Sequence, residues 1–486
     1  MSLPSASAKS LALLDVENNA VLDDFVQTDT PNTASIEKLE DLSSSPVVPA
    51  LVSLDIPFES YPEGGRGWWV VVGCAIISAG TPGVTRKADF SLSLSWGVFQ
   101  TWYKEYLFPD VEDSVLSFLG SLAGMISTPV AFVVGKLADK YGYRPFITAG
   151  CACCFVSMLV SAFCTALWQF FLAQGVLAGV GLGLVLPIVM SYPSQWFRRK
   201  RGLATGFVIA ACSFAGGATT LIAEQLLNKI GLRWTLLSYA CLYGLLMVAG
   251  LSMLKSRAHP GVAAVNRADR IRWVDRALFA DPVFWSLSLA IMLAFRGYLS
   301  PYFYIEEYTR SIIPGVSPEL VTVPAAVMNF AAALGRTLVG HAADRVGACN
   351  AFIIAVGMAG VVQLLIWNFA YNYATVMVAS ITFGFFGGTF LSLTSVMGAS
   401  LYGVNNLATL SGILTLFNTP GKSHLSRNPF MCSCNAAGAP IGGAILSAAN
   451  NNWHALISYS GATQIAGAAL LLYARFKREP RLFAVI

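Results

Sequence analysis

The sequence has 486 residues, of which 55% are hydrophobic and only 12% are charged, whereas an ordinary soluble domain carries roughly 25% charged residues. This balance excludes a water-soluble globular protein, because a soluble chain of this length needs a largely polar surface. The net charge of +5 conceals an asymmetry, since residues 1–66 hold eleven acidic and three basic residues, which leaves that segment at −8 and the remainder at +13.

The first predicted unit is residues 1–66, an acidic cytosolic tail. It is rich in Ser, Thr, Asp, Glu and Pro, a composition typical of disordered segments. Its first residues lack a basic region followed by a sustained apolar core, so no secretory signal is predicted.

About twelve apolar segments follow the tail, and a helix of roughly 20 such residues crosses a bilayer. Six form a predicted N-terminal half at 67–254, a polar cytosolic linker follows at 255–282, and six more form a C-terminal half at 283–476, with a cytosolic tail at 477–486. The predicted spans cover residues 68–103, 115–135, 146–166, 168–192, 203–222, 233–254, 283–305, 321–341, 351–370, 374–398, 408–449 and 455–474.

Two of these spans are interrupted by polar inserts, Thr81–Leu94 and Lys422–Cys434. The first insert places Arg86, Lys87 and Asp89 inside a span, at a cost of about 2.5–3.5 kcal/mol for each charge at a helix centre. Removing either insert leaves a span of ordinary length. The favoured hypothesis is that both are translated introns or gene-model errors, and the alternative is a pair of re-entrant loops lining a water-filled cavity.

The distribution of Lys and Arg predicts the orientation of the chain. The even-numbered connections and the C-terminal tail carry eighteen basic residues, and the opposite side carries Lys104, Lys229, Arg233 and Arg310. Basic residues resist translocation, so both termini and the central linker are predicted to be cytosolic.

Two loops at corresponding places in the halves have the same form. Residues 135–144 read GKLADKYGYR after the second span, and residues 340–347 read GHAADRVG after the eighth. An Asp at a helix end beside a basic residue can cap free amides and hold one conformation shut, and a glycine permits the tight turn that follows. The predicted gating residues are Gly135, Asp139, Gly142, Arg144, Gly340, Asp344, Arg345 and Gly347.

These paired loops resemble the signature loop of the major facilitator superfamily, and the resemblance extends over nearly everything after residue 62. It implies an all-α membrane fold of two six-helix halves that rock against each other to move solutes. Residues 62–68 (PEGGRGW) and 196–206 (WFRRKRGLATG) further resemble the entries to the first and fifth helices of the monocarboxylate porter family, particularly its fungal members. Arg66 stands where an aromatic residue is usual.

The resemblance to animal monocarboxylate porters aligns Arg336, in Leu334-Gly335-Arg336, with their functional arginine. Those porters place an Asp one turn earlier, where this chain has Ala332, and a Lys in the first helix, where this chain has Leu94, Ser95 and Trp96. This chain therefore lacks, at that position, the acid that those porters carry.

Ionisable and polar residues inside spans are the remaining candidates for substrate contact. Arg296 lies near the middle of the seventh span, where it either attracts an anionic substrate in a central cavity or makes a structural pair with a carbonyl or Glu306. The predicted substrate-binding set is Arg296, Arg336, Tyr302, Tyr304, Gln174 and Asn329. Each of the aromatic and amide members can instead be an interhelical hydrogen bond or an interfacial aromatic.

The sequence thus predicts a secondary transporter in the plasma membrane that moves a small organic solute, such as an organic acid, vitamin or secondary metabolite. A co-transported proton is an optional second partner beside the lipid bilayer, and no nucleic-acid partner is expected. No enzyme activity, cofactor or metal site is predicted, since no catalytic triad, phosphate loop or metal cluster occurs in the sequence. The alternatives are a non-transporting membrane sensor on the same fold and the inactive product of an unspliced transcript.

Overall fold

The computed structural model describes residues 63–80, 103–111, 113–255, 276–403, 407–417, 442, 445–450 and 452–478, and these contain helices and no strand. We call the helices from α3 to α9 the N-half and those from α12 to α19 the C-half. The N-half comprises α3 (Arg66–Gly80), η2 (Tyr103–Leu107), α5 (Asp113–Tyr141), α6 (Tyr143–Ser161), α7 (Leu167–Phe170), η3 (Phe171–Leu177), α8 (Ala178–Ser191), η4 (Tyr192–Gln195) and α9 (Arg201–Met253). After α11 (Arg276–Ala280), the C-half comprises α12 (Pro282–Ile312), α13 (Pro318–Val346), α14 (Ala348–Leu365), η5 (Trp367–Phe369), α15 (Tyr373–Gly387), α16 (Thr389–Tyr402), α17 (Leu407–Phe417) and α19 (Trp453–Arg478).

Ten helical segments within the described residues are long and apolar enough to cross a membrane. Helix α3 is shorter, and α17 has 11 described residues. These two helices mark the two remaining predicted spans, which are the spans that carry the polar inserts. Both inserts, Thr81–Leu94 and Lys422–Cys434, lie outside the described residues.

Helix α9 accounts for two of the predicted spans, because it bends between them. Gly231 has φ +74° and ψ 171° within an otherwise helical segment, a conformation that glycine adopts at little cost. The bend separates an arm that begins at Arg201 from one that ends at Met253.

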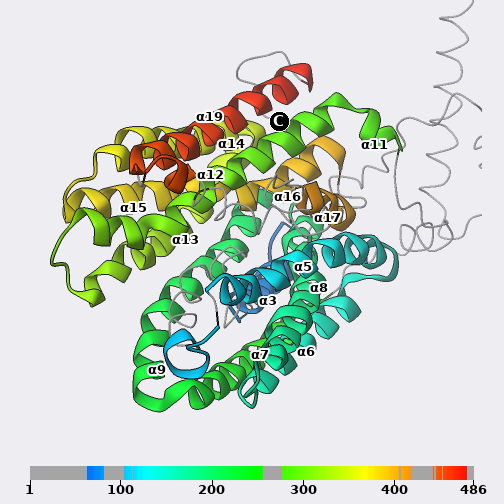
Figure 1. The fold of residues 1–486 in the computed structure, drawn as a ribbon. Coiled ribbons are helices and arrows are strands. Elements are labelled where there is room, and N and C mark those ends of the chain that lie inside the picture. The colour runs from blue at the N-terminus through cyan, green and yellow to red at the C-terminus, as the bar shows by residue number, and fades with distance from the viewer. Residues whose placement is uncertain are drawn as a thin grey trace, which may run out of the picture. The chain divides into compact units, whose positions relative to one another are not determined.

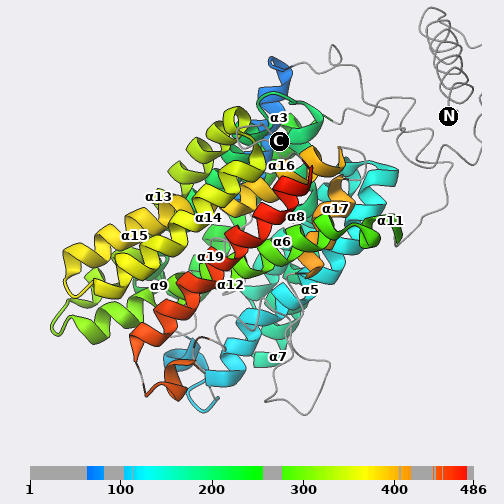
Figure 2. The same ribbon diagram turned by 90° about the horizontal axis from the view of Figure 1, so that it is seen from above.

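The two halves occupy separate parts of the bundle and meet along a limited set of helices. In Figure 1 the N-half lies below and the C-half above, with α19 and α12 side by side in the upper group. Contacts between the halves join α9 to α13 and α5 to α17. Figure 2 shows α12, α13, α14, α15 and α19 running along one common direction, as expected of helices that share a membrane.

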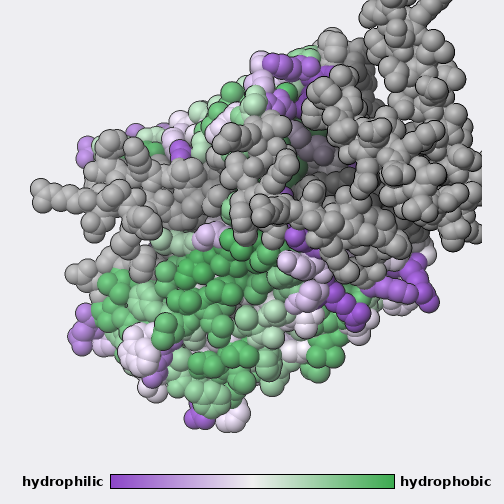
Figure 3. Space-filling view, turned by 90° about the vertical axis from the view of Figure 1, so that its right-hand side faces the viewer, coloured by the Kyte–Doolittle hydropathy of each residue, from purple (hydrophilic) through white to green (hydrophobic). Residues whose placement is uncertain are grey.

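The outer surface of the bundle is apolar, which suits contact with lipid tails. Large hydrophobic side chains are exposed on most helices, among them Val133, Val156, Phe214, Leu245 and Leu338. Figure 3 shows a broad hydrophobic face in the lower part of the view, with hydrophilic residues gathered towards its edges. A surface of this kind would be unstable in water.

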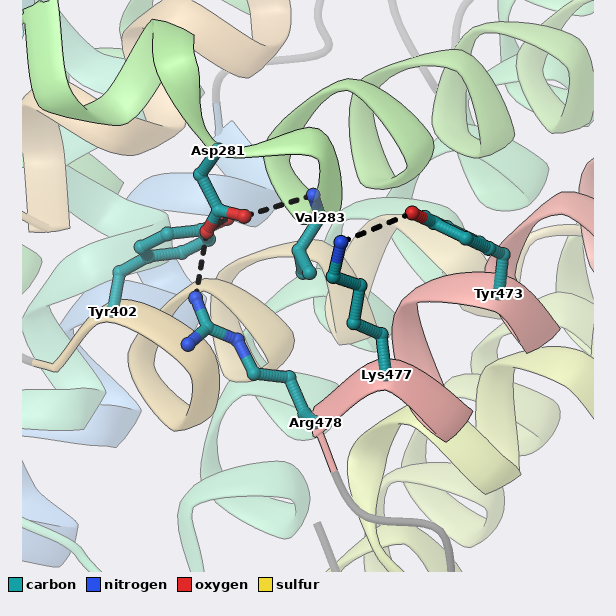
Figure 4. A network of polar contacts seen from close by, with 6 residues as sticks. All are labelled: Asp281, Val283, Tyr402, Tyr473, Lys477 and Arg478. Atoms are coloured by element: carbon teal, nitrogen blue, oxygen red, sulfur yellow. Dashed lines mark hydrogen bonds and ion pairs between the residues drawn. The ribbon is translucent and has the colours of Figure 1, made fainter.

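One polar cluster joins three helix ends in the C-half (Figure 4). Asp281 caps α12 by accepting a hydrogen bond from the Val283 amide at 3.0 Å. The same carboxyl group accepts one from the Tyr402 hydroxyl at 3.1 Å, at the end of α16, and pairs with Arg478 of α19 at 2.6 Å. The ends of α12, α16 and α19 are therefore tied together.

Candidate functional site

The paired loops connect the two halves directly. Asp139, near the end of α5, accepts hydrogen bonds from the backbone amide of Thr409 at 2.8 Å and from its hydroxyl at 2.7 Å. Thr409 lies in the first turn of α17, so Asp139 caps a helix of the C-half, where free amides and the helix dipole favour a negative charge. The Tyr143 hydroxyl donates to the same carboxylate at 2.8 Å and steadies it.

The second loop repeats this geometry in the opposite direction. Asp344, near the end of α13, accepts hydrogen bonds from the amides of Gly202 at 2.6 Å and Leu203 at 2.9 Å. Both amides lie in the first turn of α9, in the N-half. Each half therefore supplies an aspartate that caps a helix of the other, and the two halves are closed together at this end, which we call the loop end.

Close backbone approach accompanies these caps. A Cβ atom added at Gly135 would collide with the backbone of Ala408, and one added at Gly340 would collide with the carbonyl oxygen of Gly202. Gly206 lies equally close to the carbonyl of Arg336. The spacing Gly202-xxx-Gly206 thus does what its pattern predicts, since it lets a neighbouring helix approach.

The other predicted gating residues are two glycines at helix ends and two arginines. Gly142 has φ +94° and Gly347 has φ +95°, left-handed values that favour glycine and allow the tight turn after each paired loop. Arg144 and Arg345 are exposed. Their side chains lie on the surface at the loop end rather than between the halves.

Arg336 is the most unusual residue in the core, because its side chain is 0% exposed. Its Nε donates to the carbonyl oxygen of Gly388 at 3.0 Å. One terminal nitrogen donates to the carbonyl oxygen of Ile209 at 3.2 Å and to the Ser213 hydroxyl. The other terminal nitrogen donates to the Tyr298 hydroxyl at 3.3 Å. Ile209 and Ser213 belong to α9, and the other partners belong to the C-half. The guanidinium thus bridges the halves deep inside the bundle.

All of these partners are neutral oxygen atoms. Among the residues that the structure describes, no carboxylate forms an ion pair with Arg336. The carbonyl of Gly388 lies at the break between α15, which ends at Gly387, and α16, which begins at Thr389. A guanidinium is a cation under ordinary conditions, so a positive charge lies here without a counter-charge among the described residues.

Aromatic rings extend from this charge along α12. The ring centroids of Tyr298 and Tyr302 lie 4.6 Å apart, and both rings contact Phe383 at 6.2–6.3 Å. Asn329 lies on the same face of α13 as Arg336, two turns away, is 0% exposed, and has an Oδ1 atom without a hydrogen-bond partner. Flat apolar surfaces beside a cation and an amide are the elements of an organic-anion site.

The structure places the other predicted substrate-binding residues apart from this cluster. The Gln174 amide donates to the Tyr103 hydroxyl at 3.0 Å, within the N-half. Tyr304 points towards α19, with its ring centroid 6.3 Å from that of Trp453. Arg296 is partly exposed and precedes Tyr298 by two residues, which puts it roughly 200° away around α12.

Sequence reasoning did not identify two members of the cluster as site residues, Ser213 and the carbonyl of Gly388. Ser213 could have been found from the sequence, because Gly202, Gly206, Ile209 and Ser213 recur at the spacing of one helix face. The break at Gly388 had only the weak signal of two adjacent glycines.

A further contact joins the two entry segments, residues 62–68 and 196–206. The Glu63 carboxylate accepts hydrogen bonds from the amides of Arg198 at 2.8 Å and Arg199 at 2.7 Å. The rings of Trp68 and Phe197 lie 4.9 Å apart. The start of α3 is thereby fixed to the segment that leads into α9.

Comparison with known proteins agrees with this architecture. Residues 88–423 match the family model of the Major Facilitator Superfamily. The chain is 28% identical over 471 residues to the fujikurins efflux protein of Gibberella fujikuroi, covering 95% of this chain and 93% of the relative. It is 27% identical over 415 residues to the MFS transporter asaE of Aspergillus flavus, covering 85% of this chain and 88% of that relative.

Among solved structures, the fucose:proton symporter of E. coli superposes with a TM-score of 0.59 at 13% identity, over 85% of this chain and 98% of the symporter. The chain therefore belongs to the Major Facilitator Superfamily and is a multi-pass membrane transporter.

Proposed function

We propose that this transporter moves a small organic anion across the plasma membrane by alternating access, with the central site built around Arg336. The buried guanidinium of Arg336 carries this proposal, because it faces only neutral oxygen atoms among the described residues and contacts both halves. An entering carboxylate would supply the missing counter-charge and could accept two parallel hydrogen bonds from one guanidinium. Binding there would also compete with the contacts that hold the halves together.

The substrate class that fits best is an acidic aromatic or otherwise flat secondary metabolite. Tyr298, Tyr302 and Phe383 supply ring surfaces next to the charge. The fujikurins efflux protein is named for efflux of fujikurins, which supports a role in export.

The finer family assignment is the monocarboxylate-porter branch. Glu63 and Trp68 of the first entry segment contact Arg198, Arg199 and Phe197 of the second. A direct contact between the two segments that carry the resemblance gives a physical reason for them to occur together.

The loop end is the cytosolic end in this proposal, and both termini are cytosolic. Eighteen basic residues on one side against four on the other support that orientation. The aspartate caps then close the cytosolic side, so the described arrangement corresponds to a state that is shut towards the cytosol.

A co-transported proton remains a separate prediction. The position one turn before Arg336 is the fully buried Ala332, which cannot carry a proton. Imposing a pH gradient across proteoliposomes would test coupling: a proton-coupled carrier accumulates substrate against its gradient, and an uncoupled one does not.

The proposal is tested by uptake into proteoliposomes that contain the purified full chain. The probe is radiolabelled benzoate, and the matched neutral probe is benzamide, which has the same ring and no charge. We expect saturable benzoate uptake that competing aromatic carboxylates inhibit and benzamide does not. Equal saturable uptake of both probes, or uptake of benzoate that Arg336→Gln leaves unchanged, would refute an anion site at Arg336.

A further inference from the structure

Helix α12 contains a proline in its middle, and this proline leaves one backbone carbonyl without its helical partner. Pro301 lies within the continuous helix Pro282–Ile312. Proline has no N–H, so the carbonyl four residues earlier loses its hydrogen bond. In α12 that carbonyl belongs to Gly297, which directly precedes Tyr298, the residue that contacts Arg336.

Two side chains from neighbouring helices reach the freed carbonyl. The Ser460 hydroxyl on α19 donates to the Gly297 oxygen at 2.7 Å, and the Gln363 amide on α14 lies 3.5 Å from it. Ser460 and Gln363 are both 0% exposed. The glycine itself is required, because a Cβ atom at position 297 would lie 2.5 Å from the Ser460 carbonyl oxygen.

The single hydroxyl hydrogen of Ser460 lies within reach of two acceptors in this network. The Ser460 hydroxyl also contacts the amide oxygen of Gln363, yet a serine has one hydroxyl hydrogen to donate. The Gln363 amide nitrogen donates to the Gln464 oxygen at 2.9 Å and lies 3.5 Å from the Gly297 oxygen, so Ser460 is the stronger donor to the Gly297 carbonyl. The Ser460 hydroxyl can therefore donate either to the Gly297 carbonyl or to the Gln363 amide oxygen. Which of the two it bonds determines how firmly α12 is held near Pro301.

We propose that Ser460 and Gln363 are positioning residues of the transport cycle, which set the bend of α12 at Gly297 and thereby the contact of Tyr298 with Arg336. When Ser460 donates to Gly297, the bend is fixed and Tyr298 stays against Arg336. When Ser460 donates to Gln363, the carbonyl is held weakly and α12 can flex. Such a choice between two hydrogen-bond arrangements is the kind of two-state element that couples a site to a gate.

This inference rests on the alternating access proposed above, but it does not depend on which solute is carried. Its test therefore uses no substrate. Hydrogen–deuterium exchange, followed by mass spectrometry on the full chain in lipid nanodiscs, reports peptides covering residues 295–306 of α12 and 200–206 of α9. The second segment contains the amides that Asp344 caps, so a purely local packing defect in the C-half would leave its exchange unchanged.

Two substitutions are expected to act in opposite directions. Ser460→Ala removes the main donor to Gly297 and should speed exchange in both segments by about threefold, the effect of losing one interhelical hydrogen bond in a membrane. Gln363→Met removes the competing acceptor, so Ser460 donates only to Gly297 and exchange in both segments should slow. Exchange that rises in both variants would overturn the proposal.

A rescue and a matched control complete the experiment. Pro301→Ala restores an N–H for the Gly297 carbonyl, so adding Ser460→Ala to that variant should have no further effect. Ser286→Ala is the control, because the Ser286 hydroxyl joins the same two helices by donating to the Leu470 carbonyl at 2.6 Å and no proline is involved. If Ser460→Ala changes hydrogen exchange equally with and without Pro301→Ala, Ser460 contributes only packing. An equal change in exchange from Ser286→Ala would lead to the same conclusion.

Discussion

The carboxylate of Asp139 accepts hydrogen bonds from both the backbone amide and the hydroxyl of Thr409, at 2.8 and 2.7 Å, across the boundary between the two halves. Asp344 makes the equivalent pair of contacts with the amides of Gly202 and Leu203. A conformational change that separates the halves at the loop end must break all four hydrogen bonds. Closure at that end is thus stabilised by two charges placed at helix N-termini.

The first prediction concerns these two caps. Asp139→Asn keeps the size of the side chain but removes the charge and one of the two acceptor oxygens. Helix caps contribute about 1 kcal/mol each, so we expect a several-fold rise in hydrogen exchange of the first turn of α17. Benzoate transport should fall while the melting temperature stays the same.

Asp344→Asn should act in the same direction on the first turn of α9. Asp110→Asn is the control, because Asp110 is exposed and lies outside the paired loops. If Asp139→Asn and Asp110→Asn give equal exchange in α17, the contact with Thr409 does not stabilise closure.

The paired loops show how far the sequence alone leads. Their positions could be predicted because Gly135–Arg144 and Gly340–Gly347 repeat in register with the spans. Their partners could not, since Thr409 and Gly202 have ordinary local sequences and only the packing of the halves brings them to the aspartates. The helices themselves were predictable because a bilayer demands long apolar segments.

The proposed central site was less accessible to sequence analysis. Arg336 could be selected from the family resemblance, but its four partners come from α9, α12 and the junction of α15 and α16, which are distant in the sequence. Gln174 and Tyr304 were equally attractive as polar groups within spans. The structure gives them local partners, because most polar side chains in membrane helices satisfy hydrogen bonds between helices.

The second prediction separates contacts between the halves from contacts within one half. At both Gly206 and Gly384 an added Cβ would collide with a backbone carbonyl, of Arg336 and of Met328 respectively. Gly206 faces the other half, so Gly206→Ala should open the loop end and leave the melting temperature nearly unchanged. Gly384 packs within the C-half, so Gly384→Ala should lower the melting temperature by a few degrees.

Differential scanning fluorimetry measures the melting temperature, and hydrogen exchange of residues 200–206 measures the opening of the loop end. If Gly206→Ala lowers the melting temperature as much as Gly384→Ala does, the halves are not independent units at the contact between Gly206 and Arg336.

The third prediction concerns orientation. Epitope tags at both termini and within residues 261–265 should be accessible to antibody only after the plasma membrane is permeabilised. The prediction follows from eighteen basic residues on one side and four on the other. Labelling of any one of these tags on intact cells would overturn both the orientation and the number of spans. A tag in the predicted outer connection near Arg310 is the positive control for surface labelling.

The last prediction compares Arg336 with Arg296. Arg336→Gln should reduce benzoate uptake by about tenfold or more, because a hydrogen bond to a charged group is worth about 1.5–3 kcal/mol and each tenfold corresponds to about 1.4 kcal/mol. Arg336→Lys should restore part of the activity, since lysine keeps the charge but loses the paired donors of the guanidinium. The melting temperature of each variant shows whether the fold survives, because Arg336 also bridges the halves.

Arg296→Gln separates the two roles predicted for Arg296. This residue is partly exposed and lies on a different side of α12 from Tyr298 and Tyr302. If Arg296 attracts an anion into the central cavity, the substitution raises the apparent KM for benzoate and leaves expression and membrane insertion intact. Unchanged KM and rate would assign Arg296 a structural role, and Arg336 would then be the single arginine of the site. A loss of insertion would instead indicate that Arg296 stabilises the helix bundle, because a guanidinium near mid-bilayer needs oxygen atoms or water around it.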